Sequence, residues 1–242
     1  MVSLTRYFKA WYIRGHMKAY LLKIYLSLLN IIFPRECQSC KTKLSYDSRL
    51  YLCTECSKKT ELELSLATTY PEKGFSFKKA FHCYKYKGLV KNLIQSYKFK
   101  NSLFLKDTLC ELFCRASCSI VDYTKIDLIL SVPMHRIDKI KRGFNQSDIF
   151  AKALAKRVDI RYDGNILFKQ KKTHGQIKLS RKNRLHNLRD AFDIRDKEPI
   201  ENKNILLIDD VFTTGATVDE CSKTLLSSGA KNIYVLTFLR GN

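Results

Sequence analysis

The sequence predicts an α/β protein with an open, mainly parallel sheet and helices on both faces, preceded by a small cysteine-bearing module. Three short apolar runs predict strands of the sheet, at residues 127–132, 205–208 and 232–239. The first two are each followed by a turn and then by a segment with helical periodicity. Because parallel neighbours require a crossover connection, usually a helix, this alternation indicates a parallel sheet with the strand at 205–208 in its interior.

The composition is that of a folded, basic protein. The chain has 242 residues, enough for one α/β domain with a small appendage. Its hydrophobic fraction of 45% indicates a packed core, not a disordered chain. The formal net charge of +21 favours anionic partners, such as a pyrophosphate, a nucleic acid or an anionic membrane surface.

Residues 204–217 have the order expected of a phosphate-binding segment. Asp209 and Asp210 end an apolar strand, and a loop of small and hydroxyl residues follows: Thr213, Thr214, Gly215, Ala216 and Thr217. A helix is predicted from 218 to 226, and Gly229 is placed to end it. A Gly-containing turn before a helix directs several backbone N–H groups at one anion, and the helix dipole adds favourable potential there.

The paired carboxylates add a sugar site to this segment. Their oxygens suit the hydroxyls of a sugar attached to the phosphate, and a divalent metal such as Mg²⁺ would bridge them to a second phosphate group. No Lys follows the Gly, so the pattern is not a Walker loop. We expect the carboxylates to be solvated when no ligand is bound. The alternative interpretation is an ordinary strand–turn–helix unit with a capping Thr.

Four of the nine cysteines form two C-x-x-C pairs, Cys37 with Cys40 and Cys53 with Cys56. Two such knuckles give the tetrahedral thiolate set that structural zinc prefers. We expect a short hairpin over 41–52, with its turn at 46–49, between the knuckles. An odd cysteine count and paired spacing favour a reducing compartment and a Zn²⁺ site over disulfides. Two unrelated pairs, or a redox pair, are the alternatives.

These observations divide the chain into three parts: an N-terminal amphipathic segment (1–33), a zinc ribbon (34–66) and an α/β domain (75–242), with a linker over 61–77. The apolar run at 21–33 is too short and too interrupted for a transmembrane helix. We therefore expect a cytoplasmic protein with no stable membrane span. Contact of residues 1–33 with a membrane surface is the alternative to packing on the zinc ribbon.

Two further basic segments are candidates for contact with anions. Lys85, Lys87, Lys98 and Lys100 lie among Tyr84, Tyr86, Tyr97 and Phe99, and single-strand binders combine lysines with aromatic rings in this way. A solvated face is the alternative. Arg136 lies in the turn after the strand at 127–132, where α/β folds bind ligands, and a basic, Gly-punctuated segment follows it.

Residues 205–217 resemble the phosphoribosyl pyrophosphate (PRPP) loop of type I phosphoribosyltransferases. This resemblance implies that Asp209 and Asp210 bind the ribose 2′- and 3′-hydroxyls and that residues 213–217 hold the 5′-phosphate. It also implies the type I phosphoribosyltransferase fold, with PRPP and Mg²⁺ as ligands. Arg136 and the basic segment after it would face the pyrophosphate.

Further landmarks occur in the same order as in the ComF (ComFC) family, phosphoribosyltransferase-like proteins associated with DNA uptake in natural transformation. They are the two cysteine pairs, Tyr86-x-Gly88 with Lys98-Phe99, Val132–His135, Arg142–Gln146, Gln176-x-x-Leu179 with Arg184 and Asn187, and the Asp209 loop. The match extends over about residues 21–240, nearly the whole chain. It implies a role in DNA uptake, with single-stranded DNA and the uptake machinery as candidate partners.

Two functional interpretations follow. In the first, the chain is a binding module that holds PRPP in the loop and single-stranded DNA on its basic surfaces. In the second, it is an active phosphoribosyltransferase for an unidentified base or amine, outside DNA uptake. The sequence offers no clear general base and names no acceptor, so it decides neither turnover nor substrate.

Overall fold

The structure, a computed structural model, describes residues 34–45, 47–70, 74–99, 102–170 and 190–241. The chain divides into two compact units, residues 1–58 and residues 59–242. In the described ranges no helix is long and apolar enough to cross a membrane. The predicted amphipathic segment at 1–33 lies outside the described residues, as do 171–189, which include Gln176, Leu179, Arg184 and Asn187.

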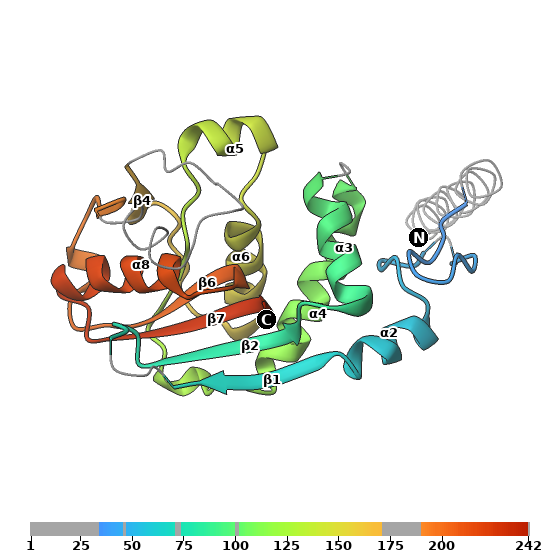
Figure 1. Cartoon of the computed structure of the whole chain (residues 1–242), viewed down its shortest axis with the longest axis horizontal. Helices are drawn as coiled ribbons and strands as arrows, with labels where there is room; N and C mark the ends of the chain where they lie inside the picture. Colours follow the sequence, from blue (N-terminus) through green and yellow to red (C-terminus); the bar gives the residue numbers. More distant parts are fainter. Residues whose placement is uncertain (1–33, 46, 71–73, 100–101, 171–189, 242) are drawn as a thin grey trace, which may run out of the picture. The chain divides into compact units, whose positions relative to one another are not determined.

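A five-stranded sheet in the order β1-β2-β7-β6-β3 forms the centre of the second unit (Figure 1). The strands are β1 (Leu64–Thr69), β2 (Lys79–Lys85), β3 (Leu128–Ser131), β6 (Asn204–Phe212) and β7 (Asn232–Arg240). β2, β7, β6 and β3 pair in parallel, and β1 is an antiparallel edge strand. The predicted mainly parallel sheet is confirmed, with β6 in its interior between β7 and β3.

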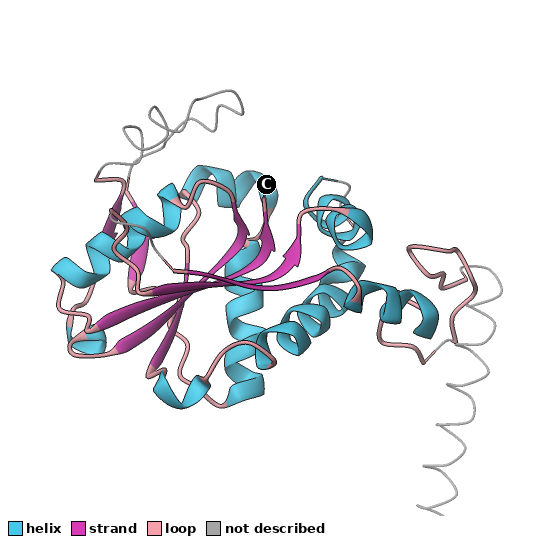
Figure 2. Cartoon of the chain, turned by 60° about the horizontal axis from the view of Figure 1, so that its bottom comes forward, coloured by secondary structure: helices cyan, strands magenta, loops and turns pink. Residues whose placement is uncertain are grey.

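Helices cover both faces of this sheet, as the sequence predicts (Figure 2). α4 (Lys106–Cys118) and α6 (Gln146–Val158) pack on one face, and α8 (Ala216–Ser227) lies on the other. The four residues Ile205–Ile208 of β6 are fully buried. A strand buried on both faces must be apolar at every position, which explains the unbroken run in the sequence.

Smaller elements surround the carboxyl ends of the strands. α3 (Gly88–Phe99) follows β2, α5 (Arg136–Arg142) follows β3, and β4 (Leu167–Lys169) pairs with β5 (Phe192–Ile194) as an antiparallel ribbon. In the described part of the chain, three 3₁₀ turns lie in the connections, at 103–105, 123–125 and 198–200. The Glu63 carboxylate accepts hydrogen bonds from the Leu89 and Val90 N–H groups (2.7 and 2.9 Å), so it fixes the start of α3.

The linker predicted over 61–77 is wrong in its middle, because residues 64–69 form β1 and pair with β2. The local pattern of this strand is weak, since four of its six residues are Ser, Thr or Ala, and its pairing with β2 defines it. The predicted strand at 205–208 is also too short, since β6 extends to Phe212.

The first unit is described from residue 34 and contains the four paired cysteines. The predicted hairpin over 41–52 is wrong in its described part, where the antiparallel bridge joins Glu36 to Lys43 across the first knuckle. Lys41 has a left-handed backbone (φ 63°), which closes that knuckle. The second knuckle runs into α2 (Thr54–Glu61), a helix that the sequence analysis did not predict.

Candidate functional site

The candidate site lies where β3 and β6 end. These strands are parallel neighbours, so their carboxyl ends meet at the same edge of the sheet. Asp209 and Asp210 lie in the carboxyl-terminal half of β6, where Asp209 pairs with Thr237 of β7. The segment after β3 carries His135 and Arg136. The two segments expected to bind ligand are therefore close in the fold.

Asp209 is held by two donors. The Ser147 hydroxyl on α6 donates to Asp209 Oδ1 (3.0 Å), and the Asp210 N–H donates to the same oxygen (2.8 Å). Burial and the neighbouring Asp210 carboxylate together raise the pKa of Asp209 to about 7, and these two donors and Lys98 oppose that rise. A half-buried carboxylate of this kind changes charge near neutral pH.

Asp210 forms an ion pair with Lys98, the last-turn lysine of α3. Both side chains are mostly buried, with exposed fractions of 19% for Asp210 and 13% for Lys98. The expectation that the two carboxylates are solvated without ligand is therefore wrong. The reason is tertiary, because the end of α3 and the start of α6 close over the end of β6.

The segment 142–146, a landmark of the sequence, builds this junction. The Phe144 ring packs on buried Tyr97 of α3, with 4.8 Å between ring centroids. The Asn145 side chain donates to the Val132 carbonyl oxygen (3.0 Å) and accepts from the Ser147 N–H (3.2 Å) as the N-cap of α6. This segment thus fixes Ser147 against Asp209 and ties α3 to the end of β3.

The loop from Thr213 to Thr217 leads into α8. Gly215 is buried with a left-handed backbone (φ +77°) and is the N-cap of that helix. A Cβ at Gly215 would lie 2.8 Å from the Phe212 ring and 3.0 Å from the Phe75 ring. Conformation and packing therefore both require glycine here. The Thr214 hydroxyl accepts a hydrogen bond from the Ala216 N–H (3.4 Å), while Thr213 is exposed.

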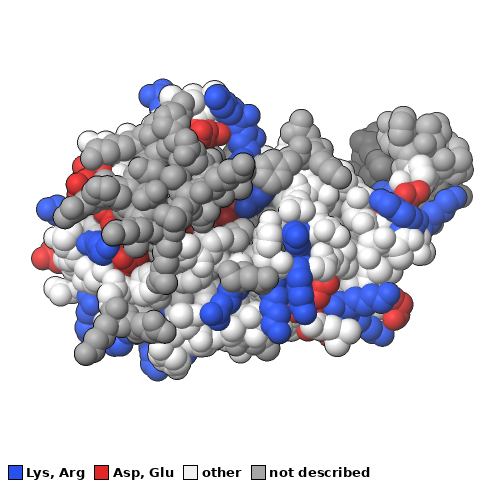
Figure 3. Space-filling view, in the orientation of Figure 1, with Lys and Arg blue, Asp and Glu red and all other residues white. Residues whose placement is uncertain are grey.

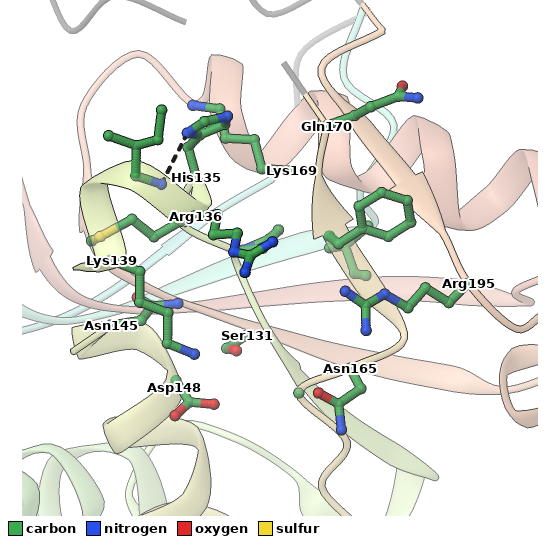
Figure 4. Close-up of a pocket in the computed structure, with 16 residues that line it drawn as sticks. Ser131, His135, Arg136, Lys139, Asn145, Asp148, Asn165, Lys169, Gln170 and Arg195 are labelled. Atoms are coloured by element: carbon green, nitrogen blue, oxygen red, sulfur yellow. Dashed lines mark hydrogen bonds between the residues drawn. The ribbon is translucent and has the colours of Figure 1, made fainter. Parts of the chain in front are cut away.

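A cavity of about 540 Å³ lies beside the carboxyl end of β3, between α5 and the β4–β5 ribbon (Figure 4). Four of its lining residues are cations: Arg136, Lys139, Lys169 and Arg195. In Figure 4 the guanidinium groups of Arg136 and Arg195 extend toward the middle of the cavity from opposite sides. Among the described residues, Arg136, Lys139 and Arg195 form no ion pair.

Asp148 is the carboxylate that lines this cavity, and its charge is already compensated. It accepts a hydrogen bond from the Tyr162 hydroxyl and forms an ion pair with Lys152 (3.0 Å). Burial lowers the pKa of Lys169, because the charged ammonium group is partly removed from water. The cavity is thus a positively charged pocket that suits an anion with several oxygens.

The four paired cysteines form one cluster, as the sequence predicts. The sulfur atoms of Cys37, Cys40, Cys53 and Cys56 all lie within 4.8 Å of one another. Tetrahedral zinc with Zn–S bonds of about 2.3 Å requires sulfurs about 3.8 Å apart, so the donor set fits. The Thr42 side chain lies 3.2 Å from Cys40 Sγ and is the main cause that lowers the pKa of Cys40 to about 6, which favours the thiolate that a metal binds.

Curated proteins similar to this chain have names that refer to competence or to DNA utilization. The chain is 35% identical over 147 residues to "Competence protein F" of Haemophilus influenzae, covering 59% of this chain and 64% of that protein. The chain is thus similar in sequence to competence protein F. It is also 24% identical over 213 residues to "Competence protein ComFC" of Bacillus subtilis, covering 84% and 83%. The predicted resemblance to the ComF family is confirmed.

Other relatives are named "DNA utilization protein YhgH". The Escherichia coli protein is 35% identical over 114 residues, which cover 47% of this chain. The chain spans about half of that protein (49%) and just under two thirds of competence protein F. No family model matches the chain.

Solved structures similar to this chain include phosphoribosyltransferases. An adenine phosphoribosyltransferase from Leishmania tarentolae is 12% identical, with a TM-score of 0.39, over 71% of this chain and 94% of that one. The glutamine PRPP amidotransferase of B. subtilis is 20% identical, with a TM-score of 0.37, over 55% and 25%. Both scores are below 0.5.

The lysines predicted to contact nucleic acid fall into different environments. Lys85 and Lys87 are exposed, Lys98 is paired with Asp210, and Lys100 lies outside the described residues. Lys91 lies over the Tyr86 ring, 5.2 Å from its centroid. Figure 3 shows Lys and Arg side chains in several separate groups on the face it views. DNA contact through these lysines remains a prediction.

Sequence reasoning missed several residues of the site. Ser147 and Lys98 contact the carboxylates, and Lys139, Lys169 and Arg195 line the cavity. The segment 142–146 was a usable signal for Ser147, because an Asn-capped helix beginning there brings its first turn to the end of β3. No local pattern distinguishes Lys169 or Arg195 from other basic surface residues.

Proposed function

We propose that this chain binds PRPP at the carboxyl ends of β3 and β6 and single-stranded DNA on its basic surface, with a role in DNA uptake. One observation carries the first part. The Asp209–Asp210 pair, the Gly215 turn into α8 and the positively charged cavity lie at the same edge of one sheet. Each of these features fits one part of PRPP.

The ribose hydroxyls of PRPP would donate to Asp209 and Asp210, and the 5′-phosphate would lie at the loop 213–217 before α8. Backbone N–H groups at the start of this helix would donate to an anion bound there. The diphosphate would extend toward Arg136, because the cavity beside β3 offers cations and no uncompensated carboxylate among the described residues. Mg²⁺ would bind with the ligand and screen the diphosphate from the carboxylates.

Calorimetric titration of the full chain with PRPP and Mg²⁺ tests this proposal. We expect saturable binding with one site and no comparable binding of ribose 5-phosphate, which lacks the diphosphate. Arg136→Met should weaken PRPP binding by roughly tenfold or more, since a charge-assisted contact to phosphate is lost. Failure of the wild-type protein to bind PRPP would refute the proposed ligand.

The DNA part of the proposal is supported by the charge of +21 and by the relatives named for competence and DNA utilization. Exposed Lys85 and Lys87, with Lys91 on the Tyr86 ring, offer cations beside an aromatic side chain. We expect affinity for an oligodeoxythymidine to fall steeply with added salt, because phosphate contacts release counterions. The double change Lys85→Glu with Lys87→Glu should weaken binding of the oligonucleotide without unfolding the protein. Binding that does not depend on salt would refute contact between these lysines and DNA phosphates.

Phosphoribosyl transfer is the second candidate function, favoured by the complete set of carboxylates, Gly turn and basic cavity. An acceptor nitrogen would attack the anomeric carbon, and pyrophosphate would leave toward Arg136 with its charge balanced by Mg²⁺ and the cavity cations. The protein would position the phosphates and exclude water. Pyrophosphate release, measured with a panel of bases and amines, tests turnover separately from PRPP binding.

A further inference from the structure

We infer that Lys98 belongs to the ligand site and is not a contact for nucleic acid. Its ammonium group neutralises the Asp210 carboxylate, so that a multiply charged anion can bind beside the two aspartates. This inference deepens the proposed function and rests on PRPP binding. Lys98 is on α3, outside the loops that resemble the PRPP site. Its ammonium group contacts the Asp210 carboxylate directly.

Burial is the first reason. The Lys98 side chain is 13% exposed, and its partner is 19% exposed. A lysine in that environment reaches a DNA phosphate only by breaking an ion pair that water screens poorly. Lys85, Lys87 and Lys106 are exposed and carry no such cost. Solvent access therefore separates Lys98 from these three lysines.

Charge balance is the second reason. Asp209 and Asp210 are adjacent on β6, and the anionic ligand must bind directly against them. Two bare carboxylates would repel a diphosphate, while one ammonium among them removes half of the formal negative charge. The cavity cations lie on the other side, around Arg136, and do not contact Asp210 in the described structure. Lys98 thus supplies the positive charge on the side of α3.

The position of Lys98 is fixed independently of its charge. Tyr97, the preceding residue, is buried and packs on Phe144, next to the Asn145 cap that holds Ser147 on Asp209. The end of α3 therefore stays at the site whether or not the ammonium group is present. Lys98→Met keeps most of the apolar stem of the side chain and removes the ammonium group with its charge and its hydrogen-bond donors.

The test measures PRPP binding by calorimetry at low and at saturating Mg²⁺. Lys98→Met should bind PRPP roughly tenfold more weakly than the wild type at low Mg²⁺, as expected for loss of a charged partner. Saturating Mg²⁺ should narrow this difference, because the metal then supplies the missing charge. Lys98→Arg should restore binding. Lys106→Met, at an exposed lysine of α4, is the control and should bind PRPP as the wild type does.

Binding of an oligodeoxythymidine distinguishes a role of Lys98 in the PRPP site from a role in DNA contact. Lys98→Met should bind the oligonucleotide as tightly as the wild type. The inference is overturned if Lys98→Met binds PRPP like the wild type at both Mg²⁺ levels, or if it loses DNA affinity while PRPP binding is kept. A wild type that binds no PRPP refutes the proposed function and this inference together. If Lys98→Met does not fold, Lys98→Gln, which still donates a hydrogen bond to Asp210, replaces it with the same expected order of affinities.

Discussion

Ser147 on α6 donates a hydrogen bond to Asp209 on β6 across 3.0 Å, and this bond joins segments 62 residues apart in the sequence. Ser147 is buried at the first turn of α6, directly after the Asn145 cap. The position of the 142–146 segment therefore determines where Ser147 lies, and Ser147 in turn orients the Asp209 carboxylate. It also favours the charged form of Asp209, against the burial and the Asp210 charge that raise its pKa.

Ser147→Ala should weaken PRPP binding several-fold, because Asp209 loses a donor that orients it and favours its ionised form. The free energy of unfolding should fall by about 1 kcal/mol, the net value of one hydrogen bond. Calorimetry and urea unfolding measure the two effects. Ser119→Ala, at an exposed serine after α4, is the control and should change neither. Wild-type PRPP affinity in Ser147→Ala would show that this bond is structural only.

The pH dependence of stability should report on Asp209. Its pKa in the folded protein, about 7, is above the value of about 3.9 for an unfolded aspartate. The folded state thus binds the Asp209 proton more tightly than the unfolded state does. Because of this, the free energy of unfolding should fall as pH rises from about 4 to about 7, and the contribution of Asp209 should no longer change above pH 7. PRPP binding should strengthen over the same upper range, as the carboxylate becomes ionised.

Asp209→Asn should remove this contribution, and urea unfolding at a series of pH values measures it. Asp196→Asn, at an exposed aspartate, serves as the control. If Asp209→Asn keeps the wild-type pH dependence, another group is responsible for it.

Asp210→Asn should abolish PRPP binding and also destabilise the fold. The change leaves the Lys98 ammonium mostly buried without its carboxylate, which costs about 1–3 kcal/mol. The combined change Asp210→Asn with Lys98→Met should recover most of that stability but not the binding. Thermal unfolding of the two single variants and the double variant measures the coupling. Additive effects of the two changes would mean that the ion pair contributes nothing to stability.

Gly215→Ala should destabilise the protein by about 2 kcal/mol and weaken PRPP binding, because it combines a left-handed backbone with contacts to Phe212 and Phe75 that are too close. Gly143→Ala separates these causes, since Gly143 has φ +83° and no atom within 4 Å of the added Cβ. Gly143→Ala should cost only the strain of the backbone, about 1 kcal/mol. Denaturant unfolding compares the two, and an equal cost would exclude the ring contacts as a cause.

Cys53→Ser should remove bound zinc and destabilise the first unit, because structural zinc contributes folding free energy directly. Elemental analysis of protein purified without chelator measures the metal, and we expect one zinc per chain in the wild type. Cys118→Ser, at an exposed cysteine outside the cluster, should keep its zinc. A wild type free of zinc would contradict the metal assignment.

The sequence by itself determined the features that depend on neighbouring residues. The continuous apolar run at Ile205–Ile208 identified an interior strand, since only a strand covered on both faces is apolar at every position. The spacing of Cys37, Cys40, Cys53 and Cys56 identified their cluster, because two residues between cysteines let both thiolates of a pair face one ion. The order of acids, Gly and helix at 209–217 located the candidate site on the same grounds.

The tertiary structure alone decided which charges meet. Lys98 looks like one of a run of surface lysines, yet it is mostly buried against Asp210, because Tyr97 packs on Phe144 and brings the end of α3 to β6. Arg195 joins Arg136 in one cavity because the β4–β5 ribbon lies beside the end of β3. Such pairings depend on helix packing and strand order over long separations, and a local pattern of residues does not contain that information.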